Sequence, residues 1–178
     1  MATHAETDEP GIETPEPVAV SKSLLANAII KDHMMACMAI SVVPVPLLDV
    51  AGMAGVQIRM IKKLSDLYDK SFSEKTARNI VSGLAGGVIG VGTGAIAAVS
   101  LSKLIPGVGT LLGIATMPVV AAGTTYAIGQ VFLKHYETDG DMYDLSVEAA
   151  RDYYKSQLAR GKDLAGKVKR TRQEPVAE

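Results

Sequence analysis

The sequence contains a single cysteine, Cys37, and this scarcity restricts the chemistry open to the chain. One thiol excludes any disulfide within the chain, which fits an intracellular setting. The first residues are acidic and polar, and they lack the basic region and apolar run of a secretory signal peptide. We therefore expect any insertion into a membrane to use internal segments rather than a cleaved leader.

Charge is almost missing from the middle of the chain. Between Asn79 and Leu133 the only charged side chain is Lys103, and residues 104–133 carry none. Such a stretch is typical of a membrane hairpin or of two helices that are buried on every side. The net charge of −1 argues against general nucleic-acid binding.

Acidic residues are absent between Glu74 and Glu137, and this absence decides how the glycines are interpreted. Residues 92–97 match the loose G-x-G-x-x-G/A dinucleotide pattern, but that motif requires an acidic residue about 20 positions downstream. The sequence also lacks a G-x-x-x-x-G-K-[ST] phosphate loop. We therefore interpret the glycines as helix-packing residues.

Candidate catalytic side chains are few. His33 and Cys37 are four residues apart and share a helix face, but two ligands do not make a metal site. Cys37 is typical of a small buried apolar residue. His4 lies in the acidic N-terminal region, and His135 follows the uncharged stretch. We predict no catalytic, cofactor or metal site, and we expect the protein not to be an enzyme.

The N-terminal third is predicted to be a tail followed by a helical hairpin. Residues 1–20 hold five acids and no Lys or Arg, which predicts a disordered tail. Ser21 or Ser23 caps a first helix that ends near Val43. Its uncharged run, residues 34–48, is shorter than the ~20 residues that cross a bilayer, so we expect a buried or interfacial helix. One face of this helix is apolar: Leu24, Ala28, Met35, Met38 and Val42.

Residues 44–46, Pro-Val-Pro, end the first helix and begin the second. The second helix reaches about Asp69 and completes a hairpin over residues 21–70. Asp49 falls in its first turn, where a carboxylate complements the helix dipole, so a structural role competes with a partner-binding role. Apolar residues recur on one face of this helix: Leu47, Val50, Ala54, Ile58, Ile61, Leu64 and Tyr68.

Residues 73–134 are predicted to form a glycine-rich hydrophobic hairpin, with Ser73 as its N-cap. Small residues four apart let another backbone approach closely, which offsets the roughly 1 kcal/mol that each helical glycine costs. Residues 80–102 are long enough to cross a hydrocarbon core of about 30 Å, and Pro118 is expected to kink the second helix. The predicted packing glycines are Gly83, Gly86, Gly87, Gly90, Gly94, Gly109 and Gly113.

Cations on both sides of this hairpin, and only Lys103 near its tip at residues 103–109, predict that both ends stay cytoplasmic. Asp141 is expected to cap an amphipathic helix over residues 141–165, with an apolar stripe that includes Tyr143 and Tyr154. Residues 166–178 are interpreted as a basic flexible tail. The alternative is that its cations add roughly 1 kcal/mol each to binding at an anionic leaflet.

Residues 26–136 resemble a known family. The motifs are Val43-Pro-Val-Pro-Leu-Leu-Asp49, Gln57-Ile-Arg-Met60 leading to Leu67-Tyr68, Leu104-Ile-Pro-Gly-Val-Gly109 and Ala122-Gly-Thr-Thr-Tyr-Ala-Ile-Gly129. In this order and spacing the chain resembles the YcjF-type family of uncharacterised bacterial domains. That resemblance implies a helical, membrane-embedded domain encoded beside, or fused to, an Era-like GTPase. This chain contains no GTPase domain, so nucleotide hydrolysis would come from a partner.

These observations predict an all-α bundle of about five helices around a glycine-rich hydrophobic, transmembrane hairpin. We expect a non-catalytic adaptor or scaffold in the bacterial inner membrane, with both termini cytoplasmic, that contacts lipid, forms homo-oligomers and works with a small GTPase. Asp49, Arg59 and Met60 are the partner-binding candidates. The alternatives are a membrane-remodelling or pore-forming hairpin and a soluble, cytoplasmic oligomeric scaffold.

Overall fold

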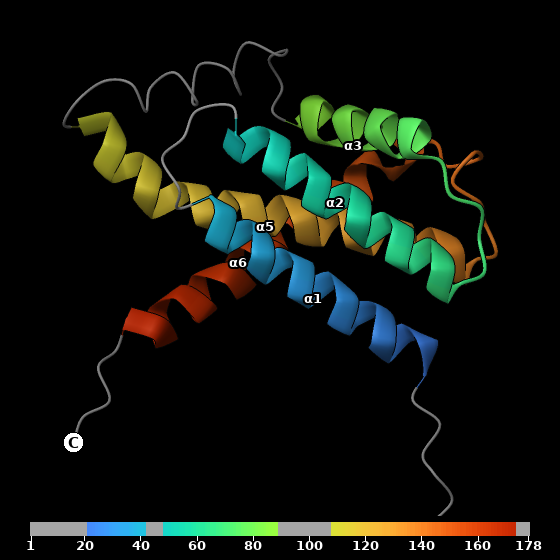
Figure 1. Cartoon of the computed structure of the whole chain (residues 1–178), viewed down its shortest axis with the longest axis horizontal. Helices are drawn as coiled ribbons and strands as arrows, with labels where there is room; N and C mark the ends of the chain where they lie inside the picture. The colour runs from blue at the N-terminus through green and yellow to red at the C-terminus, as the bar shows by residue number, and fades with distance from the viewer. Residues whose placement is uncertain (1–20, 42–47, 89–107, 174–178) are drawn as a thin grey trace, which may run out of the picture.

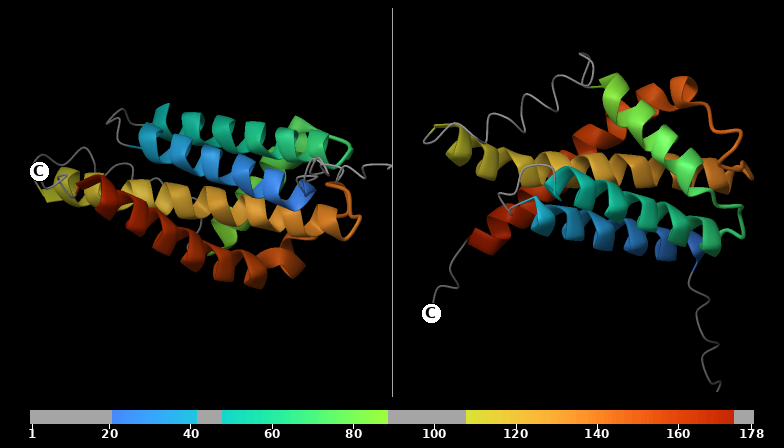
Figure 2. Two further views of the ribbon diagram at one scale, coloured as in Figure 1. Left: turned by 90° about the horizontal axis from the view of Figure 1, so that it is seen from below. Right: turned by 45° about the horizontal axis from the view of Figure 1, so that its top comes forward.

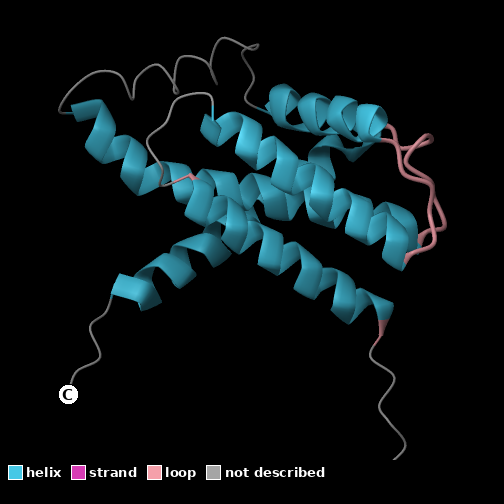
Figure 3. Ribbon diagram, in the orientation of Figure 1, coloured by secondary structure: helices cyan, strands magenta, loops and turns pink. Residues whose placement is uncertain are grey.

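The computed structural model describes residues 21–41, 48–88 and 108–173, which form a helical bundle without strands in these ranges (Figures 1 and 3). The all-α class predicted from the sequence is therefore confirmed. Residues 89–107, which include most of the predicted hairpin tip, lie outside the described ranges. The described helices are α1 (Lys22–Ile40), α2 (Leu48–Leu67), α3 (Glu74–Val88), α5 (Val108–Glu137) and α6 (Val147–Gln173).

Serine side chains cap the helices where the structure describes their N-termini. The Ser21 hydroxyl accepts from the backbone N–H of Leu24 at 3.3 Å, and Ser73 accepts from that of Thr76 at 3.3 Å, so both predicted caps are confirmed. Helix α6 starts later than predicted because Ser146, rather than Asp141, accepts from its first turn. The same helix continues to Gln173, past the boundary expected at residue 165.

Helices α2 and α5 both stop at an aspartate in the left-handed region. Asp69 has φ of 57° and Asp139 has φ of 65°. In each case the next N–H reaches back five residues: Lys70 donates to the carbonyl of Ser65 at 2.9 Å, and Gly140 to that of His135 at 3.0 Å. These are Schellman endings, which satisfy carbonyls that would otherwise lack a partner.

Helix α5 is the central element, and α1, α2, α3 and α6 all pack on it. From Ala121 to Leu133 every residue except Thr124 is buried. This part of the uncharged stretch is covered by the other helices of the bundle. Its lack of charge follows from burial on all sides, the alternative that the sequence left open.

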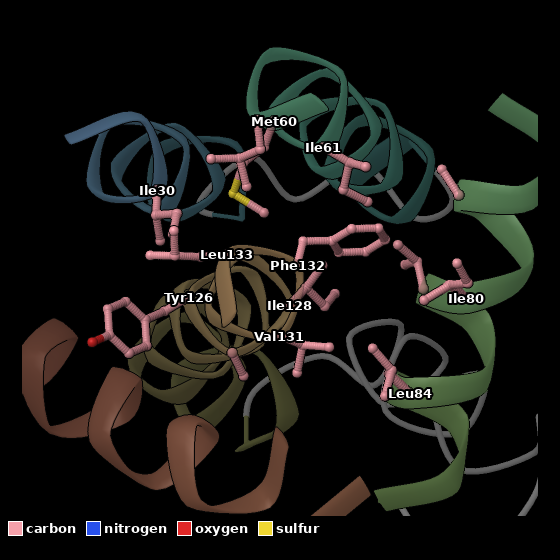
Figure 4. Close-up of a cluster of buried hydrophobic side chains, with 14 of the residues drawn as sticks. Ile30, Met60, Ile61, Ile80, Leu84, Tyr126, Ile128, Val131, Phe132 and Leu133 are labelled. Atoms are coloured by element: carbon pink, nitrogen blue, oxygen red, sulfur yellow. The ribbon is translucent and has the colours of Figure 1, made fainter. Parts of the chain in front are cut away.

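The apolar side chains of α5 reach all its neighbours (Figure 4). Ile30 of α1 and Met60 of α2 lie around Leu133, while Phe132 lies between α2 and α3. Ile30, Met60 and Phe132 are each 0% exposed. Full burial of a side chain of this kind is worth about 1.5–3 kcal/mol, so these contacts stabilise the arrangement of four helices around one.

Helices α5 and α6 meet backbone to backbone. A Cβ placed on Gly161 would lie 3.0 Å from the Cα and the carbonyl oxygen of Gly123, and 2.9 Å from the Cβ of Tyr126. A Cβ on Gly123 would lie 3.2 Å from the backbone nitrogen of Lys162. Only glycine at both positions allows this approach, because any side chain would force the helices apart.

Three hydrogen-bonded pairs join α5 to the α1–α2 hairpin. The Gln57 amide donates to the hydroxyl of Thr125 at 3.2 Å, and the Gln130 amide donates to Asn27 at 2.8 Å. The Ser65 and Tyr136 hydroxyls lie 2.8 Å apart. A slip of one helix along another would leave these buried polar groups without partners, so the pairs fix the register.

The helix directions give the bundle two different ends (Figures 1 and 2). The apolar end is where α1, α3 and α6 finish and where α2 and α5 begin. Residues 41–48 join α1 to α2 and residues 88–108 join α3 to α5 at this end, and these two segments contain Lys103 as their only charged residue. The C-terminal half of α6, by contrast, is rich in cations. At the opposite, polar end, Lys22 pairs with Asp69 at 3.0 Å and Lys70 pairs with Asp139 at 2.5 Å.

Replacing Gly161 with alanine is expected to lower the free energy of unfolding by about 1–3 kcal/mol, because the added methyl group overlaps the backbone of α5. Gly166→Ala in the same helix is the matched control. A Cβ there meets no atom within 4 Å, so helix propensity should raise the free energy by about 0.5–1 kcal/mol. Urea denaturation measures the free energy of unfolding of both variants. A Gly161→Ala midpoint at or above that of the wild type would contradict the close contact.

Alkaline pH should destabilise the fold through two buried tyrosines, because burial raises the pKa of Tyr136 and of Tyr154 to about 12. In the unfolded chain a tyrosine loses its proton near pH 10, so the unfolded state is favoured as pH rises from about 10 to about 12. Each tyrosine lowers the free energy of unfolding by up to about 1.4 kcal/mol per pH unit in this window.

Urea denaturation at a series of pH values tests whether the free energy of unfolding falls in this window. Tyr154→Phe should flatten the fall in stability, whereas Tyr143→Phe, at a side chain that is 65% exposed, should leave it unchanged. An equally steep fall in Tyr154→Phe would show that other groups cause the alkaline loss.

Candidate functional site

The two candidate catalytic residues of α1 are part of the packed interior. His33 is 7% exposed and Cys37 is 0% exposed. The Nδ1 of His33 donates to the carbonyl of Ile29, 2.7 Å away on the same helix. Across the described ranges, no three His, Cys, Asp or Glu side chains cluster closely enough to hold a metal ion. His33 and Cys37 therefore act in this structure as core residues.

His135 lies at the polar end, where α5 turns towards α6. Its Nε2 is 2.6 Å from a carboxylate oxygen of Asp144 and 2.8 Å from the carbonyl of Asp141. The hydrogen bond from His135 lowers the pKa of Asp144. The same carboxylate accepts from the N–H of Asp141 at 2.9 Å. These bonds hold the connection between the two helices in one conformation, which is a structural role.

The other charges of the polar end also tie helix ends together. The Lys70 ammonium donates to the carboxylate of Asp139 and lowers the pKa of that carboxyl group. The Tyr68 hydroxyl donates to Glu137 at 3.3 Å, and the N–H of Ser71 donates to Asp141 at 3.3 Å. Because Asp139 is 97% exposed, its ion pair adds little stability on its own. Collectively these groups give the polar end a hydrated surface.

The three partner-binding candidates are placed differently. Arg59 is exposed on α2. Met60 is 0% exposed and packs in the core, so a partner would reach Arg59 but not Met60 in this arrangement. Asp49 is in the first turn of α2, and the surroundings of its side chain lie outside the described part of the chain. Partner binding at these positions stays a prediction.

Two of the seven predicted packing glycines, Gly83 and Gly86, have surroundings that the structure describes. A Cβ on Gly83 would meet Val147 of α6 at 3.0 Å, so this glycine does allow a close helix contact. A Cβ on Gly86 would meet nothing within 4 Å, because this residue is exposed. The surroundings of the other five, Gly87, Gly90, Gly94, Gly109 and Gly113, lie outside the described part of the chain.

The tightest glycine contacts between two helices involve residues that sequence reasoning did not assign to packing. They are Gly123 and Gly161 between α5 and α6, and Gly129, where a Cβ would lie 2.7 Å from the side chain of Ile30. In the sequence, Gly123 and Gly129 belong to the family-like motif at residues 122–129 and lack the four-residue spacing of the predicted packing glycines. Gly161 lies in a charged, polar-looking helix, and nothing in the local sequence distinguishes it from Gly166.

Helix α1 exposes much of its apolar surface. It is long and apolar enough to cross a membrane, with a mean hydropathy of 1.2, yet only 28% of that window is buried in the bundle. Its inward face carries Ala26, Ile30 and Cys37. Three residues of the stripe predicted from the sequence are exposed instead: Leu24 at 65%, Met35 at 37%, and Ala28. Met38 of the same stripe is half-buried against the core, and Val42 lies outside the described residues. The outer face of α1 is therefore the main uncovered apolar surface among the described helices.

Comparison with known proteins adds two findings. The model of a family described as "Domain of unknown function (DUF697)" matches residues 20–163. A protein named "Magnetosome membrane protein 22", from Magnetospirillum gryphiswaldense, is 53% identical over 162 residues, which cover 91% of this chain and 83% of that protein. No solved structure matches the chain.

Proposed function

The chain belongs to the family described as Domain of unknown function (DUF697), and from that premise we propose that it is a non-catalytic, membrane-associated helical scaffold. One observation carries the proposal: α1 is long and apolar enough to cross a membrane, yet only 28% of that window is buried in the bundle. A relative that is 53% identical is named as a membrane protein, which supports the same function.

The burial of α1 distinguishes it from an ordinary core helix. The interior helix of a soluble protein can have the same hydropathy, but its neighbours cover it, as they cover α5 here. On α1 the outward face carries large apolar side chains, and an apolar face of this kind marks a surface that meets lipid or another protein. Membrane lipid is the occupant we propose for the part of α1 nearest the apolar end, where Met35 and Ala39 are exposed. Leu24 and Leu25 are also exposed, but they lie at the polar end of α1 and outside this contact.

The two ends of the bundle suggest how such a scaffold would sit. The apolar end gathers the helix termini that border the uncharged segments of the sequence. The polar end carries ion pairs and exposed carboxylates, which a membrane would exclude. We therefore place the apolar end at the bacterial inner membrane and the polar end in the cytoplasm.

The finer part of the proposal is an adaptor role. The resemblance to the YcjF-type family favours a small GTPase as the partner, and the small-residue faces of the glycine-rich stretch motivate the expectation of a homo-oligomer. Of the partner-binding candidates, Arg59 is the one whose side chain a partner could contact, because it is exposed on α2 while its neighbour Met60 is buried. Gly86, which is exposed and has no neighbour across its helix, is a position where a second copy could approach.

Membrane association is tested by fractionating cells and washing the membranes at alkaline pH. The wild-type chain should stay in the membrane fraction. The double variant Met35→Glu/Ala39→Glu should be at least tenfold enriched in the soluble fraction, because each acid at an inserted position costs about 2.5–3.5 kcal/mol. Both positions are exposed, so the fold itself should change by no more than about 0.5 kcal/mol.

The control places two acids at exposed sites of the polar side, in Tyr143→Glu/Ala149→Glu. This variant should stay with the membrane. Release of the wild-type chain by the alkaline wash would remove the membrane proposal and favour a soluble oligomeric scaffold.

The adaptor role is tested by recovering the native protein from detergent-solubilised membranes and identifying what accompanies it. A small GTPase should be recovered with the wild type, and Arg59→Glu should reduce the recovery several-fold by reversing a rim charge. Lys63→Glu, which changes another exposed cation of α2, is the control. Repeated purification without any GTPase would count against this partner and leave the membrane scaffold standing.

A further inference from the structure

Helix α6 changes its electrostatic character halfway along. Residues 147–159 balance two acids against two cations, whereas residues 160–173 contain six cations and one acid, Asp163. The fold anchors the start of this second half, since Gly161 packs against Gly123 and Tyr126 of α5 and Ala165 is fully buried. The helix is therefore held as part of the bundle rather than attached as a loose tail.

The anchored face determines which cations are presented outwards. Arg160, Lys167 and Arg170 are all exposed, and their spacing of seven and three residues puts them on one side of the helix, opposite Gly161 and Ala165. Lys167 pairs with Asp163 at 2.8 Å, but both side chains are more than half exposed, so the pair can open at little cost. The result is an outward basic stripe on a fixed helix.

The stripe also lies in a particular place. Helix α6 runs towards the apolar end, where α1 ends and α5 begins (Figure 2). A basic helix beside the apolar contact region is the arrangement that suits an anionic leaflet, because the chain inserts apolar side chains while cations meet the headgroups. A nucleic acid would match the charge but would leave the exposed apolar face of α1 without a partner.

We propose that the C-terminal half of α6, residues 160–173, is an arm that binds anionic phospholipid headgroups at the apolar end of the bundle. This inference rests on the membrane association proposed above and adds the class of lipid and the residues that select it. The outward stripe, Arg160, Lys167 and Arg170, supplies the selectivity. Because α5 holds the helix in place, binding requires no ordering of a flexible segment.

The test measures binding of the full chain to vesicles of phosphatidylcholine alone and of phosphatidylcholine mixed with phosphatidylserine. The wild type should prefer the anionic vesicles. The triple variant Arg160→Gln/Lys167→Gln/Arg170→Gln should bind them roughly 10- to 100-fold more weakly while it keeps its binding to neutral vesicles. Glutamine has a helix propensity close to that of the residues it replaces, so circular dichroism should show unchanged helix content.

The matched control is Lys62→Gln/Lys63→Gln/Lys75→Gln. It also removes three exposed cations and one i,i+4 ion pair, that of Lys62 with Asp66, but towards the polar end. Binding of this control should equal that of the wild type. An equal loss in both triple variants would show that total charge matters and not the arm, and it would overturn the proposal.

A fluorescent label checks the geometry independently of charge. Cys37 is 0% exposed, so a polarity-sensitive dye should react with cysteines introduced at exposed Thr171 or Lys75. On anionic vesicles the emission of labelled Thr171→Cys should shift to the blue, and that of labelled Lys75→Cys should not. A shift at Lys75 alone would overturn the proposed orientation of the arm.

The remaining outcomes distinguish failure of the lipid-binding arm from failure of the membrane association proposed above. If the wild-type chain binds neutral and anionic vesicles equally, the proposal that residues 160–173 bind anionic headgroups is overturned, and membrane association is retained. A chain that binds neither kind overturns both proposals. If a mixed-sequence DNA duplex binds the wild type in preference to vesicles, and the arm variant loses that binding, then the stripe recognises nucleic acid and the lipid assignment is wrong.

Discussion

The backbone contact between Gly123 and Gly161 is the constraint on which the rest of the bundle depends. Two helices can approach this closely only where neither carries a side chain, and both glycines are needed because each faces the other helix. The contact lets α6 cover one side of α5 while α1, α2 and α3 cover the others. An isolated helix would be weakened by these glycines, and the packing that they permit offsets that cost.

The burial of α5 from Ala121 to Leu133 explains how polar residues are used around it. A uniformly apolar helix could slide or rotate against its neighbours with little loss, since hydrophobic contact is not directional. The bonds of Gln57, Gln130 and Tyr136 remove that freedom because each buried polar group has one partner in one register. The Schellman endings at Asp69 and Asp139 then fix where the helices stop, and the polar end assembles from those turns.

The bundle that results is stable as a unit yet unequal at its two ends. The core packs around α5 without the exposed apolar side chains of α1. Those side chains therefore remain available to contact lipid or another protein. The same geometry carries the cations of α6 towards the end where uncharged segments of the chain begin and finish. An amphipathic arrangement on the scale of the whole molecule follows from helix directions, and no single helix shows it.

The sequence by itself determined the helical class, the caps at Ser21 and Ser73, and the approximate extents of α1 and α2, because capping, proline corners and apolar periodicity act within a few residues. Tertiary structure decided which apolar residues are inside. Met60 and Leu24 are similar in hydropathy, and only the position of α5 makes one a core residue and the other a surface residue. It also decided which glycines matter, since Gly161 and Gly166 differ only in what lies opposite them, and that depends on a helix nearly forty residues away in the chain.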